Sequence, residues 1–223
     1  MIPSNDASGD PGNEARQRFT DAFIRNAHLI LLGGYLRLNA TEYHSSEENE
    51  ITGDLAREMM SYIETSSEPW MQLCQVHDQH PVTAPGGPRT TRRVGKRRPK
   101  IDLQFVANTG SRFHRFSWEA KRLGKGHAIG DYLGEAGLGC FLSGQYSSEC
   151  DFGGMLGYVQ SGKPADRTSE IHMRLGKAFV RVESRATDFP TTTLVSRHSR
   201  PSLKSEITIF HTILRFSSSE LVQ

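Results

Sequence analysis

Apolar residues recur along this chain with two different periods, and the changes of period outline its secondary structure. Over residues 14–38 they recur every three or four positions, as on one face of a helix, and Gly33-Gly34 is expected to break or kink that helix. Ser45 or Ser46 is expected to cap a second helix that runs to about residue 64. Further helices are predicted over 70–76, 127–143 and 170–175.

Strand patterns follow in the second half of the chain. Apolar and polar residues alternate over 101–106, a turn sequence occupies 108–111, and a second strand is predicted over 112–121. These two strands are expected to pair as an antiparallel hairpin. Further strands are predicted over 155–159, 192–196 and 207–216. The order of helices first, then strands with helices between them, predicts an α/β (α+β) fold without internal repeats.

Composition narrows the class of protein. The chain has 223 residues, of which 36% are hydrophobic and 23% charged, as in ordinary globular proteins. We expect a disordered tail over 1–13 and a single domain over 14–223. The longest aliphatic run, Leu29–Leu32, is too short to cross a bilayer, and no signal peptide is apparent. Three cysteines without a disulfide framework favour a cytoplasmic location.

A basic segment stands out against the rest of the chain. Residues 89–100 carry seven positive charges and no acid, which leaves 20 of the 27 Lys and Arg against 25 Asp and Glu elsewhere, a net charge of −5. A basic loop over 81–100 is therefore predicted to contact nucleic acid, the alternative being a solvated loop. The residues expected to bind nucleic acid are Arg92, Arg93, Lys96, Arg97 and Arg98.

Two carboxylates and an ammonium are expected to converge at one end of the predicted hairpin. Glu119 and Lys121 are two residues apart on a strand and so leave the same face, and Asp102 lies on the adjoining strand. Carboxylates bind Mg²⁺, which stabilises charge on a phosphate, and a lysine can place a positive charge beside the attacking water. This set predicts metal-assisted phosphodiester hydrolysis; the alternative is an exposed surface pair.

The same residues carry a resemblance to a known family. Lys100-Ile101-Asp102 followed by Trp118-Glu119-Ala120-Lys121 resembles the motif of the PD-(D/E)XK, or restriction-endonuclease-like, nuclease superfamily. A bacterial branch of uncharacterised nucleases found among anti-phage defence genes is similar over 48–52, 119–123, 132–141, 144–146, 153–159 and 209–216. The resemblance implies a restriction-endonuclease-like core, a mixed four- to five-stranded sheet flanked by helices.

The resemblance also implies roles for individual residues. Asp102, Glu119 and Glu48 would bind Mg²⁺, with Mn²⁺ as a possible substitute, and Lys121 would assist the reaction. Glu48 matches the family's helix acid and shares a helical face with Ile51, whereas Glu50 lies on a more exposed flank. Acids that complement the helix dipole are the simpler explanation for both. Where the family pattern has an arginine before Phe141, this chain has Gly139-Cys140.

The function expected from these features is a metal-dependent nuclease, a DNA endonuclease acting as the effector of a bacterial anti-phage defence system. A regulatory protein partner or homo-oligomer is expected to control it, and no membrane is involved. The alternatives are a non-catalytic nucleic-acid-binding or assembly subunit with a nuclease fold, and an RNase toxin. Gly124-Lys125-Gly126, just after the site, is either a simple turn or a set of backbone N–H donors for phosphate.

Overall fold

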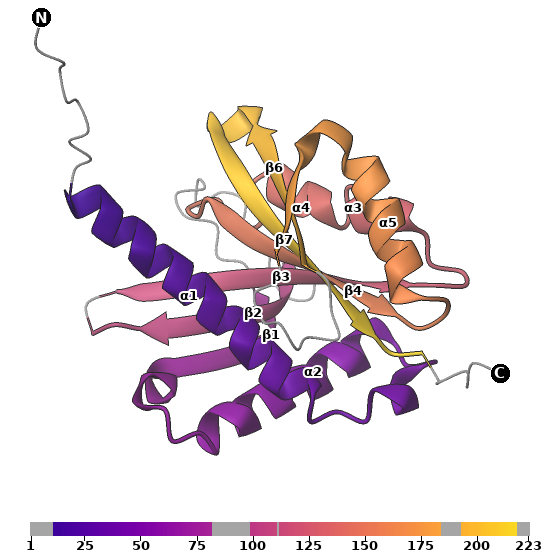
Figure 1. Cartoon of the computed structure of the whole chain (residues 1–223), viewed down its shortest axis with the longest axis horizontal. Helices are drawn as coiled ribbons and strands as arrows, with labels where there is room; N and C mark the ends of the chain where they lie inside the picture. Colours follow the sequence, from indigo (N-terminus) through magenta and orange to yellow (C-terminus); the bar gives the residue numbers. More distant parts are fainter. Residues whose placement is uncertain (1–10, 82–98, 111, 184–192, 218–223) are drawn as a thin grey trace, which may run out of the picture.

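The fold is built on a sheet of seven strands within the residues that the computed structural model describes, 11–81, 99–110, 112–183 and 193–217. The order across the sheet is β1-β2-β3-β4-β7-β6-β5 (Figure 1). β3, β4 and β7 are parallel, and β1, β2, β6 and β5 pair antiparallel with their neighbours. The strands are β1 Cys74–Pro81, β2 Lys100–Asn108, β3 Phe113–Leu123, β4 Phe152–Val159, β5 Phe179–Glu183, β6 Thr193–Arg200 and β7 Ser205–Arg215. The predicted mixed α/β class is confirmed, with seven strands where four or five were expected.

Helices cover both faces of this sheet and divide the apolar core in two. On one face, α1 (Pro11–Tyr35) and α2 (Glu48–Glu64) pack against side chains such as Phe105 and Phe116. On the other, α3 (Ile129–Leu133), α4 (Leu138–Leu142) and α5 (Pro164–Leu175) pack against Met155 and Ile213 (Figure 1). Short 3₁₀ turns occupy η1 Ala40–Tyr43, η2 Pro69–Leu73, η4 Gly176–Ala178 and η5 Pro201–Leu203. Among the described residues, no helix has the length and apolar character needed to cross a membrane.

The first helix differs from its prediction at both ends. α1 begins at Pro11, three residues before the expected start, so the predicted tail over 1–13 is too long; residues 1–10 lie outside the described residues. Gly33 and Gly34 lie within the helix instead of breaking it. A Cβ at Gly33 would meet the ring of Tyr62, and one at Gly34 would meet the backbone of Met59. The two glycines therefore serve the close approach of α1 to α2.

The second helix begins with a different cap from the one expected. Glu47, not Ser45 or Ser46, is the N-cap of α2, and it forms a capping box with Glu50. The Glu47 amide donates to Oε2 of Glu50 over 3.0 Å. The Glu50 side chain therefore caps the start of the helix, whereas the Glu48 side chain can point toward the sheet.

Three other predicted helices need correction. The segment predicted as a helix over 70–76 is a 3₁₀ turn followed by β1, and the helix predicted over 127–143 is two short helices separated at Gly134–Gly137. α5 begins at Pro164, where proline suits the first turn of a helix, and not at residue 170. Strands β1 and β5 were not predicted.

The predicted hairpin and the three later strands are confirmed, with longer boundaries. β2 and β3 pair antiparallel from Asn108↔Phe113 to Leu103↔Trp118. Because both faces of the sheet are covered here, the polar residues Asp102 and Gln104 in the middle of β2 are buried, and Gln104 donates to the Ser117 hydroxyl over 3.2 Å. The pairing of β2 with β3 ends at Leu103 and Trp118, and the candidate site begins just beyond that pair.

Candidate functional site

Asp102 occupies the point where β2 separates from β3. Its Oδ2 accepts the amide N–H of Ala120 over 2.9 Å, a backbone donor that lies past the last strand pair. Asp102 is 8% exposed, and its carboxylate accepts the hydrogen bond that a paired residue of β2 would otherwise accept. This bond fixes the Asp102 side chain next to the two residues that flank Ala120 on β3.

The side chains of those two residues, Glu119 and Lys121, project from the same face of β3 and contact each other. The Lys121 ammonium donates to Glu119 Oε1 over 2.7 Å and to the carbonyl oxygen of Ala120 over 2.6 Å. It lies 3.9 Å from Oδ2 of Asp102. The predicted convergence of Asp102, Glu119 and Lys121 is thus present in the structure.

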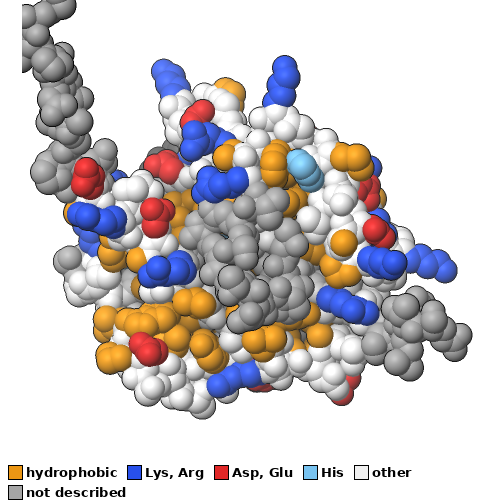
Figure 2. Space-filling model, viewed as in Figure 1, with side chains coloured by type: hydrophobic (Ala, Val, Ile, Leu, Met, Phe, Trp, Pro, Cys, Tyr) orange, Lys and Arg blue, Asp and Glu red, His pale blue; other side chains and the backbone are white. Residues whose placement is uncertain are grey.

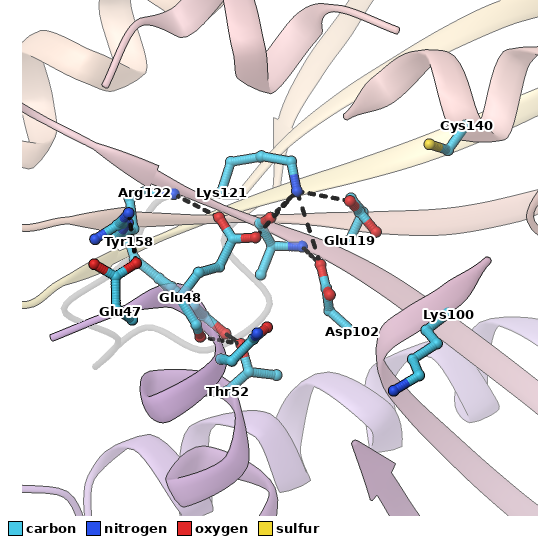
Figure 3. A network of polar contacts seen from close by, with 12 residues as sticks. Glu47, Glu48, Thr52, Lys100, Asp102, Glu119, Lys121, Arg122, Cys140 and Tyr158 are labelled. Atoms are coloured by element: carbon cyan, nitrogen blue, oxygen red, sulfur yellow. Dashed lines mark hydrogen bonds and ion pairs between the residues drawn. The ribbon is translucent and has the colours of Figure 1, made fainter. Parts of the chain in front are cut away.

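The first turn of α2 brings in the fourth predicted residue. Glu48 Oε1 accepts from the Lys121 ammonium over 3.2 Å, and its Oε2 accepts the amide N–H of Arg122 over 3.2 Å. Figure 3 shows the ammonium surrounded by the carboxylates of Glu48, Asp102 and Glu119. Glu50, the competing acid, is exposed and takes no part in this cluster.

Gln79 on β1 completes the surroundings of Asp102. Its amide donates to Asp102 Oδ1 over 3.1 Å and to Asn49 Oδ1 over 3.2 Å, which links β1, β2 and the start of α2. Its φ of 48° is unusual for a residue with a side chain. Gln79 was not among the predicted site residues because β1 was not predicted.

Burial and like charges shape the electrostatics of the cluster. Burial, with the charge of Asp102, raises the pKa of Glu119 from 4.5 to about 8. Burial also raises the pKa of Glu48, although Lys121 opposes it. For Lys121, burial favours the neutral amine, but Glu119, Glu48 and Asp102 outweigh that effect and raise its pKa. Three carboxylates facing one ammonium leave an excess of negative charge in a largely buried place.

One atom of the cluster has no partner among the described residues. Oε2 of Glu119 is buried there without a hydrogen bond, although a carboxylate oxygen can accept two. An unpaired buried acceptor beside excess negative charge suits a hard divalent cation, which prefers oxygen ligands. As the side chains stand, Lys121 lies between the acids, and no group of three or more His, Cys, Asp or Glu within the described parts of the chain is gathered for a metal.

Two further residues adjoin the acids from the α3–α4 side. Tyr146 donates from its hydroxyl to the carbonyl oxygen of Lys100 over 2.6 Å, which ties it to the start of β2. Burial raises the pKa of the nearby Cys140 thiol to about 11, so this thiol is neutral near pH 7. Cys140 therefore supplies no charge on this side of the acids.

The basic segment can be placed only by its ends. Arg92, Arg93, Lys96, Arg97 and Arg98 lie outside the described residues. The described residues closest to that segment on the strands, Pro81 and Lys100, are paired across β1 and β2, two positions from Asp102 along β2. On the face in Figure 2, the coloured Lys and Arg side chains are spread apart and do not form one patch.

Comparison with known proteins found no match for this chain. No protein-family model matches the chain, and no curated protein or solved structure matches it either. The function of the protein must therefore be inferred from the residues of the site.

Proposed function

We propose that this protein is a metal-dependent nuclease that hydrolyses phosphodiester bonds, and that it acts as a DNA endonuclease in bacterial anti-phage defence. The observation that carries the proposal is the buried cluster of Asp102, Glu119 and Glu48 around the Lys121 ammonium. Buried charges cost several kcal/mol to desolvate, so a cluster with more acids than bases calls for a function. The mixed sheet with helices on both faces is compatible with the restriction-endonuclease-like core that the motif implies.

Each residue of the cluster has a part in this proposal. Asp102, Glu119 and Glu48 would hold Mg²⁺ or Mn²⁺, and the unpaired Glu119 Oε2 is the acceptor most ready to do so. A divalent ion bound there would stabilise the charge that develops on the phosphate and lower the pKa of the attacking water.

Lys121 would act on the substrate directly. Its three N–H donors have three acceptors in the structure, on Glu119, Glu48 and the Ala120 carbonyl. Once a cation neutralises the acids, Lys121 can turn one donor toward a phosphate oxygen or the attacking water. The removal of one such charge contact typically slows a reaction by about 10²–10³-fold.

The basic segment would add affinity without sequence selectivity. Pro81 and Lys100 fix its two ends beside the strand that carries Asp102. We propose that Arg92, Arg93, Lys96, Arg97 and Arg98 contact backbone phosphates that flank the scissile bond.

The test is incubation of the purified protein with plasmid DNA, single-stranded DNA and RNA, with and without Mg²⁺ or Mn²⁺. Metal-dependent linearisation or degradation of the plasmid supports the proposal, and cleavage of RNA alone would assign the chain as an RNase. Asp102→Asn, Glu119→Gln and Lys121→Gln should each lose activity, and the exposed Asp131→Asn serves as the matched control. Binding without cleavage by the wild type would contradict the proposal and assign a non-catalytic subunit.

A further inference from the structure

A polar cavity adjoins the candidate site along β3. It has a volume of about 210 Å³ and is enclosed by the end of β3, the turn that follows it, the end of β4 and the segment before α2. None of its eight lining residues is acidic, whereas four of them, Arg122, Lys125, His44 and His127, are basic side chains. The charge of its lining is thus opposite to that of the neighbouring acid cluster.

Hydrogen bonds hold the walls of the cavity in place. The Gln160 side chain donates to the carbonyl oxygens of Tyr43 over 2.8 Å and of Ser46 over 2.7 Å, which fastens the segment before α2 to the end of β4. The Lys125 amide donates to the Ser161 hydroxyl over 2.6 Å. Gly124 has a φ of 144°, and a Cβ there would press against Ser161. The cavity is therefore part of the fold and does not depend on loose surface side chains.

Arg122 connects the cavity to the acid cluster. Its backbone amide donates to Glu48 inside the cluster, and Arg122 is also one of the residues that line the cavity. In Figure 3, Arg122 and Glu47 lie on the side of Glu48 that faces away from Glu119. Arg122 directly follows Lys121 on β3, about 3.3 Å further along the strand, and Lys125 lies in the turn after β3, so the cavity adjoins the position of Lys121.

We propose that this cavity binds a backbone phosphate of the nucleic acid, close to the phosphate that is cleaved. The inference rests on the proposed function, because it deepens the same site. A phosphate oxygen accepts hydrogen bonds only, and the residues that line the cavity include Arg122, Lys125, Ser45 and Ser161, whose side chains carry hydrogen-bond donors. None of these groups reads a base, so the contact positions the strand without selecting a sequence.

In the free protein, the Glu47 carboxylate occupies the position beside Arg122 that the phosphate would take. Its Oε2 pairs with the Arg122 guanidinium at 2.8 Å, and its side chain is 71% exposed. Only the Glu47 side of this pair is exposed, since the Arg122 side chain is 21% exposed, so a phosphate that takes the place of the carboxylate keeps the guanidinium paired. Removal of the Glu47 charge should therefore strengthen phosphate binding, the opposite of the effect expected for Arg122 or Lys125.

The experiment measures the binding of the full chain to a fluorescein-labelled 12-nucleotide single strand, as DNA and as RNA, by anisotropy in EDTA. Arg122→Gln and Lys125→Gln should each weaken binding by about tenfold, the loss of one charge-assisted contact. Each should lower the slope of log K against log salt by about 0.7. Glu47→Ser, which keeps a good N-cap, should strengthen binding by about twofold or more. Lys177→Gln, an exposed lysine after α5, is the matched control and should change binding less than twofold.

Cleavage kinetics separate this inference from the proposed function. In Mg²⁺, the Arg122 and Lys125 variants should raise KM by about the same factor as Kd and leave kcat within about threefold. Cleavage by the wild type with unchanged KM and Kd in both variants would overturn the inference and leave the nuclease proposal intact. A wild type that neither binds nor cleaves would overturn both. Strands with a 5′-hydroxyl and a 5′-phosphate distinguish the source of the phosphate: equal losses identify an internal phosphodiester, and losses confined to the phosphorylated strand identify a terminal one.

Discussion

Replacement of Glu119 by Gln is expected to stabilise the metal-free protein and to abolish cleavage. Gln keeps the shape of the side chain and an acceptor for the Lys121 ammonium, but it cannot ionise beside Asp102. Because the carboxylate is buried and one of its oxygens has no partner among the described residues, the folded protein disfavours its charged form. Glu119→Gln therefore removes the free-energy cost of ionising this buried carboxyl group, a cost that the proposed metal-binding role would account for.

The magnitude is set by the pKa of Glu119. That pKa is raised from 4.5 to about 8, so above pH 4.5 the unfolded chain loses the proton while the folded protein keeps it. Stability consequently falls as pH rises from about 4.5 to about 8; below that window this group costs nothing, and above it the full cost remains without further change. At about 1.36 kcal/mol per pH unit, the cost at pH 7 is about 3 kcal/mol. For a chain of this length, relief of that cost should raise the melting temperature by roughly 6–12 °C.

The assay is thermal unfolding of wild type and Glu119→Gln in EDTA at pH 5, 7 and 8, followed by circular dichroism. The gain in the variant should be small at pH 5 and largest at pH 8, and the exposed Glu206→Gln should show no such trend. Mg²⁺ should then stabilise the wild type more than the variant. A variant that melts at or below the wild-type temperature at pH 7 and 8 would refute the reasoning.

Three other substitutions test separate parts of the structure. Glu48→Gln should slow plasmid cleavage by about 10²-fold. Glu50→Gln should leave the rate within about threefold and cost at most about 1 kcal/mol in urea unfolding, because Gln keeps the capping-box acceptor and loses only the charge at the helix N-terminus. Gly34→Ala should cost about 1–3 kcal/mol in urea unfolding because its Cβ meets the backbone of α2. Gly130→Ala should not destabilise the protein, because a Cβ there makes only an ordinary contact with the end of the Arg174 side chain. His211 is buried with a pKa lowered to about 3, so protonation of the unfolded chain makes stability fall as pH drops from about 6.5 to about 3. His211→Gln should flatten that fall, by about 1.4 kcal/mol per pH unit, in urea unfolding measured across this range.

The parts of the fold that sequence could predict are those with strong local patterns. The β2–β3 hairpin has clear alternation and a turn sequence, and the spacing of Glu119 and Lys121 on a strand places both on one face. Helical phase likewise placed Glu48, and not Glu50, toward the core. These inferences needed only the periods of helices and strands.

The parts that were missed depend on tertiary context. β1 is an edge strand with mostly polar residues, so it lacks the alternation of a strand with one apolar face, and its Gln79 was missed with it. The glycines at 134 and 137 split the helix predicted over 127–143, although its apolar positions fit one face. Gly33 and Gly34 had the opposite outcome, because contact with α2 outweighs their low helix propensity. The polar cavity beside Arg122 is built from three separate segments of the chain, 44–45, 122–127 and 160–161, and no local pattern could indicate it.

The bond between Lys121 and Glu48 joins residues that are 73 positions apart. A growing chain presents α2 first, and β3 becomes available only after a long further stretch of the domain has been made. Glu48 on α2 is therefore made well before Lys121, its partner on β3. β3 also pairs in parallel with β4, which is made later still. Nascent and partly folded chains would lack the assembled cluster. For a nuclease, activity would therefore begin only after β3 and β4 have both been made and paired.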